Sequence, residues 1–314
     1  MQHRFGLWMS RLAVVAALAL GGCGVAPRLA PVAAPSALPA PSVPETAASA
    51  AVRAHYAKVQ ASLLSAGLLR TQTAPEDAPF NDRNLTDNFL KIALYEEYAG
   101  GQITRHGRAA PIRLQRWDQP VRVALIIGPA VPKAQVATDR AWVTSYFARL
   151  AKITGHPIVM DDQNPNFWVH IATIDERAAM AGTLNAEMPG LTQGQIASVT
   201  NMDDDTYCQV LTSTVEATST YARAVAVIPS EHPDLMRLAC IHEELAQSLG
   251  LPNDSNAAHP SIFNDDQEFA LLTKQDELML RILYNPALHP GMSEAEARPI
   301  VQSLASRLMG GEGS

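Results

Sequence analysis

The sequence predicts a mixed α+β fold in which a twisted, mixed sheet packs on helices. Apolar residues alternate with other residues between Val121 and Ile127, just before Gly128–Pro129, and this pattern predicts a strand. Residues 136–153 instead carry an apolar stripe with the period of a helix, which Gly155 ends. The same reasoning predicts strands over residues 158–160, 167–174 and 222–228.

Two helices are predicted before this region. An apolar stripe through residues 51–69 predicts a first helix that packs on an apolar partner. A second helix is predicted over residues 88–98, with Thr86 or Asp87 as its N-cap. We therefore divide this part of the chain into an N-terminal helix and linker, residues 51–79, and one domain, residues 80–308.

The charge balance excludes several classes of protein. The chain has 314 residues, with 24 Lys and Arg residues against 31 Asp and Glu residues, and a formal net charge of -7. Because nucleic-acid-binding surfaces are basic, no nucleic-acid partner is expected. No apolar run beyond the N-terminus is long enough to span a bilayer, so a polytopic membrane protein is not expected either.

The N-terminus has the features of a secretory signal peptide. Residues 1–22 combine Arg4 and Arg11 with a short apolar run, and small residues precede Cys23. The string Leu20–Cys23 resembles a bacterial lipobox, in which the Cys thiol is acylated and the Cys becomes the new N-terminus. The alternative is an ordinary transmembrane anchor, for which the apolar run is short.

This resemblance implies a lipid anchor in the bacterial cell envelope. Gly24, rather than an Asp, follows the cysteine, which favours the outer membrane with the protein facing the periplasm. Residues 24–50 contain six prolines among Ala and Ser, and this composition predicts an extended tether without a core of its own. Residues 23–50 are thus expected to hold the domain away from the membrane.

Two cysteines are left once Cys23 carries the lipid. In an oxidising compartment, Cys208 and Cys240 pair most simply as a disulfide. Such a bridge would close a loop of about 30 residues and stabilise the fold by roughly 3–4 kcal/mol. Two buried free thiols are the alternative, because a sequence does not show whether the two Cα atoms lie close together.

The best-defined helix covers about residues 233–249. Pro233 suits its first turn, Asp234 suits the positive end of its dipole, and Gly250 suits its C-terminal cap. The stripe expected to face the core consists of Leu235, Leu238, His242, Leu245 and Leu249. We therefore expect His242 to be packed and hydrogen-bonded rather than to hold a ligand.

This helix carries the spacing of a metal site without the usual ligands. In H-E-x-x-H zinc sites two imidazoles four residues apart reach one metal, but Ala246 stands four residues after His242. Shifting the frame by one residue gives the spacing of H-E-x-x-H-x-x-G-x-x-H, filled by Glu243, Glu244, Gln247, Gly250 and Asn253.

Oxygen donors replace the imidazoles in this shifted frame. Glu243, Gln247 and Asn253 would suit Ca²⁺, Mg²⁺ or Mn²⁺ better than Zn²⁺, so a divalent metal is a candidate cofactor and a zinc peptidase is disfavoured. Glu244 occupies the position of a general base. His242 and Asp254 are expected to contact the ligand residues rather than the metal itself. In the alternative reading, these side chains only hydrogen-bond one another or the nearby backbone.

Further oxygen donors surround the loop after this helix, namely Asn253, Asp254, Asn264, Asp265, Asp266 and Glu268. Their spacing matches no EF-hand, and Asn and Asp are common in turns and helix caps. A cation site and an ordinary turn therefore both stay open. The run Asp203–Asp205 is expected to be a solvated loop.

Three runs in the C-terminal half carry a family resemblance: residues 240–254, 261–266 and 276–284, with Pro290–Met292 after them. Over roughly residues 80–300, the sequence resembles the domain of unknown function 2927, a family of proteobacterial envelope proteins. The name of this family implies no established activity.

A remoter resemblance is to the metzincins. Ser248–Leu251 is similar to the end of their active-site helix, and Thr273–Tyr284 is similar to their closing helix. All three His ligands are replaced, and Ile262 and Phe263 stand where metzincins have a Met-turn. The resemblance implies a zincin-like fold with an active-site-type helix at about 233–249 and a smaller C-terminal helical part.

These observations favour a lipid-anchored protein whose zincin-like domain binds a peptide or another envelope component without catalysis. The alternative is a metal-dependent, peptidase-like hydrolase with Glu244 as general base. A third hypothesis is a scaffolding lipoprotein. Only the hydrolase requires a bound metal, so metal content separates it from the other two.

Overall fold

The computed structural model of the chain describes residues 43–96, 110–215 and 218–310. The chain divides into two compact units, residues 1–37 and 38–314, and all described residues belong to the second unit. The predicted signal peptide, the lipidation site Cys23 and most of the tether therefore lie outside the described residues. No helix within the described ranges is long and apolar enough to cross a membrane.

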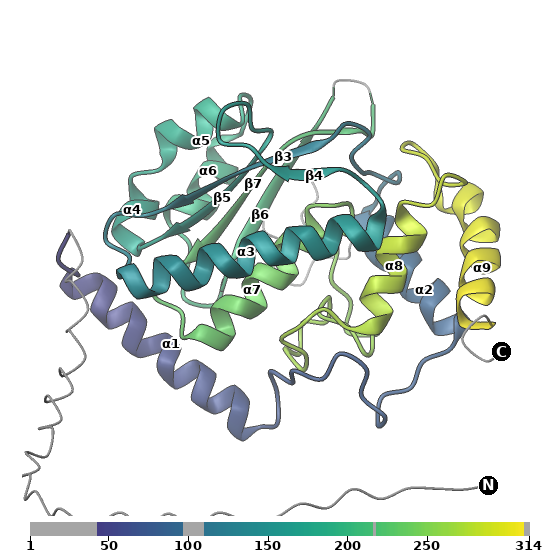
Figure 1. Ribbon diagram of the computed structural model, residues 1–314, viewed down its shortest axis with the longest axis horizontal. Coiled ribbons are helices and arrows are strands. Elements are labelled where there is room, and N and C mark those ends of the chain that lie inside the picture. Colours follow the sequence, from purple (N-terminus) through teal and green to yellow (C-terminus); the bar gives the residue numbers. More distant parts are fainter. Residues whose placement is uncertain (1–42, 97–109, 216–217, 311–314) are drawn as a thin grey trace, which may run out of the picture. The chain divides into compact units, whose positions relative to one another are not determined.

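The elements alternate between helices and strands along the described chain (Figure 1). The helices are α1 (Ala47–Ser65), α2 (Asp82–Ala93), α3 (Lys133–Thr154), α4 (Ile174–Ala178), α5 (Ala181–Glu187), α6 (Gln193–Thr200), α7 (Asp234–Gln247), α8 (Lys274–Leu283) and α9 (Glu294–Gly310). The strands are β1 (Tyr95–Glu96), β2 (Ala110–Pro111), β3 (Val121–Ile127), β4 (Ile158–Met160), β5 (Phe167–Ala172), β6 (Gln209–Thr214) and β7 (Tyr221–Pro229).

Among the described residues, five strands form the main sheet, in the order β4-β3-β5-β7-β6. Strand β3 is parallel to β4 and β5, and β5 is parallel to β7, with Val123 opposite Phe167 and Phe167 opposite Ala224. The edge strand β6 is antiparallel to β7. The mixed sheet and the α+β class are thus confirmed, whereas β6 and the short helices α4, α5 and α6 were not predicted.

The sheet is covered on both faces, and strand β7 shows this most clearly. Ala224, Ala226 and Ile228 belong to the large core that includes residues of α3 and α7. Val225 and Val227 point to the other face, into a smaller core with residues of α5 and α6. Figure 1 shows α3 and α7 on one side of the sheet and α4, α5 and α6 on the other. This double burial explains the continuous apolar sequence of β7.

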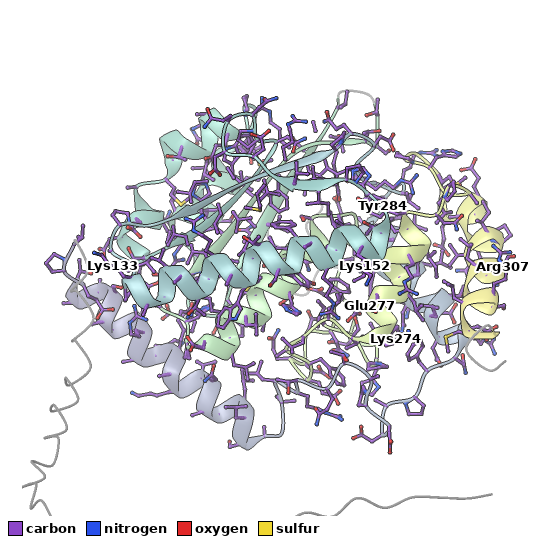
Figure 2. The ribbon with its side chains drawn as sticks, viewed as in Figure 1. Lys133, Lys152, Lys274, Glu277, Tyr284 and Arg307 are labelled. Carbon is purple, nitrogen blue, oxygen red and sulfur yellow. A yellow bond between two sulfur atoms is a disulfide. The ribbon has the colours of Figure 1, made fainter. Side chains whose placement is uncertain are left out.

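Helix α3 crosses the sheet and joins the C-terminal helices. Figure 2 marks Lys133 and Lys152 towards its two ends and Glu277 on the neighbouring helix α8. Arg149 of α3 donates hydrogen bonds to Glu277, with a shortest N–O distance of 2.8 Å. Gly155 adopts the left-handed conformation at the end of α3, as the sequence predicts.

Helix α2 begins earlier than predicted. Its N-cap is Asn81, whose side chain accepts a hydrogen bond from the Asn84 amide, while the Asn84 side chain accepts one from the Asn81 amide. The prediction of Thr86 or Asp87 as the cap is therefore wrong. Thr86 and Asp87 lie inside the helix because this reciprocal capping box satisfies the amide groups of an earlier first turn.

Candidate functional site on helix α7

Helix α7 leaves the sheet directly after β7 and is buried on most sides. Of the predicted apolar stripe, Leu245 and Leu249 are buried, but Leu235 and Leu238 are only half-buried. Near the N-terminus of the helix, Met236 faces the interior instead, where it joins a cluster with residues of α1. The predicted stripe is therefore right in the second half of α7. In the first half, Leu235 packs at the edge of the cluster shared with α1, and Met236 rather than Leu238 is the buried residue, because α1 supplies an additional partner there.

The end of α7 is fixed by groups from distant segments. The Trp117 indole donates to the Ser248 carbonyl at 2.9 Å, and the Tyr284 hydroxyl donates to the Leu249 carbonyl at 2.9 Å. Gly250 has a φ of +123°, and a Cβ atom on it would lie 2.2 Å from the Gln115 carbonyl oxygen. The side-chain donors satisfy helix-end carbonyls, and only glycine fits the turn that follows.

His242 is a packed residue of the interior. Its side chain is 8% exposed, and its Nδ1 accepts a hydrogen bond from the Leu272 amide at 3.0 Å. The ring stacks on Tyr146 at a centroid distance of 4.0 Å, and the Tyr146 hydroxyl donates to the His242 carbonyl. Burial, and to a lesser extent the positive charge of Arg149, lowers the pKa of His242 to about 3. The imidazole is therefore neutral and is used as a hydrogen-bond acceptor.

Replacing His242 by glutamine is expected to reduce the acid sensitivity of the fold. Because the folded-state pKa of about 3 lies below the ordinary value of 6.5, the unfolded chain binds the extra proton between these values. The neutral ring thus contributes full stability above pH 6.5, and about 1.4 kcal/mol is lost per pH unit below it. Urea unfolding measures the free energy of unfolding at pH 7 and at pH 5. Its loss between these two values should be about 2 kcal/mol smaller in His242→Gln than in the wild type. Equal losses in both proteins would contradict this account.

Glu243 is half-buried and lines a small pocket beside the disulfide. The other lining residues are Leu69, Tyr207, Met236, Ala239, Cys240 and Gln267. The pocket has room for about one water molecule. Neither Gln247 nor Asn253 lines it, so the structure does not bring the three candidate metal ligands together around this space.

Glu244, the candidate general base, lies on the interior side of α7. Its side chain is only 5% exposed. A general base has to come within hydrogen-bonding reach of a substrate proton, directly or through one water molecule. In this conformation, the surrounding residues separate Glu244 from any substrate in solvent.

Gln247, Asn253 and Asp254 are held by other groups of the protein. The Gln247 amide donates to a carboxylate oxygen of Asp254 at 3.1 Å. Buried Asn253 donates from its side chain to the Lys91 carbonyl at 2.9 Å and from its backbone to the Ile92 carbonyl. Asn253 therefore fastens the turn after α7 to the last turn of α2, whose carbonyls need such donors.

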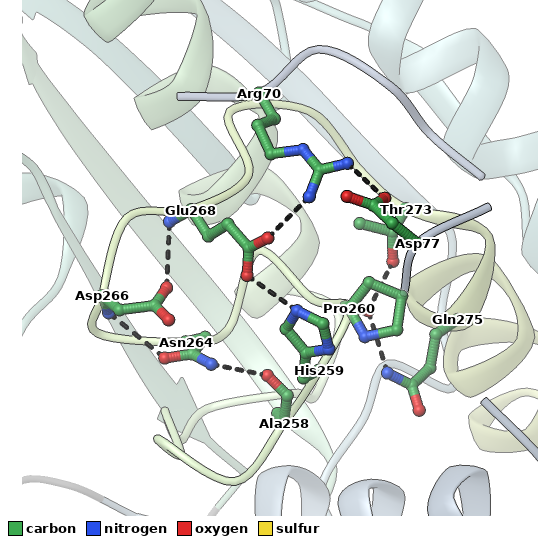
Figure 3. Close-up of polar contacts among 10 residues, drawn as sticks. All are labelled: Arg70, Asp77, Ala258, His259, Pro260, Asn264, Asp266, Glu268, Thr273 and Gln275. Carbon is green, nitrogen blue, oxygen red and sulfur yellow. Dashed lines mark hydrogen bonds and ion pairs between the residues drawn. The ribbon is translucent and has the colours of Figure 1, made fainter. Parts of the chain in front are cut away.

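The oxygen-rich loop is built from turns and ion pairs (Figure 3). The Asn264 side chain accepts from the Asp266 amide, and the Asp266 carboxylate accepts from the Glu268 amide at 2.9 Å. Glu268 in turn pairs with Arg70 at 2.8 Å and with His259 at 2.7 Å. Among the described residues, no group of three or more His, Cys, Asp or Glu side chains is placed to hold a metal ion. The turn interpretation accounts for these contacts.

The predicted disulfide between Cys208 and Cys240 is confirmed. The two Cα atoms lie 5.9 Å apart, and 32 positions separate the cysteines in the sequence. The bridge connects the segment before β6 to the middle of α7.

Sequence reasoning missed a buried polar cluster at the start of α7. Arg237, 1% exposed, donates to Asp139 of α3 at 2.7 Å and to the His232 carbonyl at 2.6 Å. Ser230 and Glu231 are also buried. The available signal was the run Ser230–His232, three polar residues between an apolar strand and a helix.

The fold and this helix define an α+β domain in which a largely buried helix with several buried polar side chains follows strand β7 of a mixed sheet. Residues 82–303 match the model of a family described as "Protein of unknown function (DUF2927)", and the chain belongs to this family. The match begins at the first residue of α2, so α1 lies before it. No curated protein and no solved structure matches the chain.

Proposed function

We propose that the protein is a lipid-anchored component of the bacterial cell envelope whose zincin-like domain binds a peptide or another envelope component without metal catalysis. The observation that carries this proposal is that the polar side chains at the metal-site spacing hydrogen-bond to other parts of the chain. Gln247 and Asn253 hold other parts of the chain, and the preceding His242 accepts a backbone amide. These residues support the framework of a zincin helix.

The zincin-like part of the proposal draws support from the order of elements. A mixed sheet leads from β7 directly into α7, and a smaller helical part formed by α8 and α9 follows. This is the arrangement that the sequence resemblance implies. The replaced histidines at the ligand positions agree with a framework that is kept after the metal chemistry is lost.

The location in the proposal comes from the N-terminal sequence. Acylation of Cys23 would place one lipid group at the start of the mature chain, and Gly24 favours the outer membrane. The Pro-rich tether between this residue and α1 would let the domain reach a partner in the periplasm.

The hydrolase alternative requires more changes to the site. Glu243, Gln247 and Asn253 would have to leave their present surroundings and meet at one metal, and Glu244 would have to become accessible. The contacts of Asn253 with the end of α2 oppose such a movement. The present arrangement of these residues therefore counts against the hydrolase alternative.

Metal analysis tests the proposal directly. We expect the purified chain to contain less than about 0.1 mol of divalent metal per mol of protein, and chelation to leave its melting temperature unchanged. A Gln247→Ala variant serves as a control, since its metal content should equal that of the wild type. Stoichiometric metal that is lost with Gln247, together with a melting temperature that falls on chelation, would overturn the proposal in favour of the hydrolase.

A further inference from the structure

The carboxyl ends of the parallel strands β5 and β7 meet at one edge of the sheet. In open α/β sheets this edge is where ligands bind. Arg177 follows β5, and Ser230, Glu231 and His232 follow β7. All four residues are at least 97% buried. The edge therefore combines a guanidinium, a carboxylate, an imidazole and a hydroxyl group in a small region.

Several polar atoms of this cluster lack partners. Within the described ranges of the chain, no hydrogen bond is made by Arg177 Nε, Ser230 Oγ, Glu231 Oε2 or His232 Nε2. Buried polar atoms without partners are rare in folded proteins and cost stability. With α1 in place, part of the hydrogen-bonding capacity of the cluster thus stays unused, as expected of a covering segment that another ligand can displace.

Helix α1 covers the cluster with a single polar stripe. The Ser49 hydroxyl donates to Glu231 at 2.9 Å, and the Tyr56 ring packs edge-on against His232 at a centroid distance of 4.2 Å. Further contacts join Arg53 to the Ser230 carbonyl and the Gln60 side chain to the Met236 amide. The four stripe residues, Ser49, Arg53, Tyr56 and Gln60, are spaced 4, 3 and 4 positions apart, which places them on one face of α1.

Helix α1 is attached more weakly than the rest of the domain. Only Ser49 and Tyr56 of its 19 residues are buried. Gly67 follows the helix with a φ of +80°, and a Cβ atom placed on it would meet no other atom within 4 Å. Immediately afterwards, the backbone amides of Leu69 and Arg70 bond to carbonyls at Gln267 and Glu268. The chain is therefore fastened by backbone hydrogen bonds after Gly67. Helix α1 itself is held by the stripe, by the Thr46 hydroxyl, which donates to Asp175, and by a few half-buried apolar residues, Val52, Val59 and Leu63, which pack on the cluster around Met236.

We propose that α1 is a releasable strap hinged at Gly67, and that it closes a binding site formed by Arg177, Ser230, Glu231 and His232. The contacts of α1 define the ligand class: a helical peptide that presents a hydroxyl, a guanidinium, an aromatic ring and a carboxamide on one face. The matched family domain begins only after α1, and α1 begins at Ala47, within the last four residues of the predicted tether. Release of the strap would thus connect the membrane anchor to this site.

Amide hydrogen exchange on the full chain tests the release. We expect the amides of α1 to exchange through a local opening, with protection at least about 100-fold below that of β5 and β7. The Ile174 amide, bonded to Glu231, and the Met236 amide, bonded to Gln60, should open together with α1. The Ser230 amide is the internal control, because its bond to the Ala172 carbonyl should survive the opening. If the amides of α1 exchanged only when the whole domain unfolds, the proposal would be overturned.

A peptide of residues 44–66 tests the ligand class. The full-chain variant Ser49→Ala/Tyr56→Ala weakens the resident strap, so it should bind the fluorescent peptide at concentrations on the order of micromolar, whereas the wild type should bind at least about tenfold more weakly. A peptide with the four stripe residues exchanged for alanine is the control and should not bind. Absence of binding to a variant whose α1 exchanges freely would overturn the proposed ligand class. The metal analysis above is independent of both experiments, so the inference and the proposed function fail separately.

Discussion

Replacing Arg237 by methionine is expected to lower the free energy of unfolding by about 3–5 kcal/mol, because it leaves a buried carboxylate without its partner. Asp139 is fully buried, and Arg237 donates to it at 2.7 Å. Burial raises the pKa of Asp139, and Arg237 opposes that shift. The same guanidinium lies over Trp142 and bonds to the His232 carbonyl, so its loss also frees the start of α7.

Urea unfolding of two further variants identifies the cause. In Arg237→Met/Asp139→Leu both charges are removed, and most of the lost stability should return, because no charge is left buried alone. Arg298→Met is the matched control: Arg298 pairs with Glu294 in a half-exposed position, and its loss should cost no more than about 1 kcal/mol. If the double variant were as unstable as Arg237→Met, the effect would come from packing of the long side chain instead.

The elements that could be predicted from the sequence are those with complete local patterns. Strand β3 alternates and stops before Gly128, and helix α3 stops before its cap Gly155, so both were located within a few residues. Strand β6 escaped prediction because its sequence, Gln209–Thr214, has few apolar residues. It is a strand because β7 pairs with it, and that pairing is a tertiary interaction.

The burial of His242 followed from its place in an apolar helical stripe, since the side chains of such a stripe share one direction. The surroundings of Asn253 did not follow, because the end of α2 that it contacts is 162 residues away in the sequence. The same limit applies to Arg177 and Glu231. Arg177 lies in α4, after β5, and Glu231 lies between β7 and α7, so the two become neighbours only because β5 and β7 pair in parallel.

This difference explains why the sequence indicated a site at the C-terminal end of α7, whereas the structure indicates one at its N-terminal end. Motif spacing draws attention to Glu243–Asn253, where residues of one helix and its turn follow a known pattern. Four buried polar atoms without a hydrogen bond, on Arg177, Ser230, Glu231 and His232, gather before the first turn of α7, where three separate segments of the described chain meet. No local pattern describes a meeting of this kind.

Removing the disulfide with Cys208→Ala/Cys240→Ala is expected to lower the free energy of unfolding by roughly 3–4 kcal/mol, because the unfolded chain regains the entropy of a loop of 32 positions. The bridge also joins α7 to the segment before β6, beside the small pocket that Glu243 lines. Urea unfolding of the oxidised wild type, the reduced wild type and the double variant measures this contribution.

The reduced wild type and the double variant should unfold at similar urea concentrations, below that of the oxidised protein, and reductant should not affect the double variant. If the bridge acts only on the unfolded chain, it leaves the folded α7 unchanged. The amides of α7 should then be equally protected from hydrogen exchange in the oxidised wild type and the double variant, when both are compared at urea concentrations equally far below their unfolding midpoints. A selective loss of protection in α7 would show instead that the bridge positions this helix in the folded state. In that case, the Cys240 side of α7 would depend on the redox state of the compartment, while the His242 contacts with Leu272 and Tyr146 would hold the opposite side.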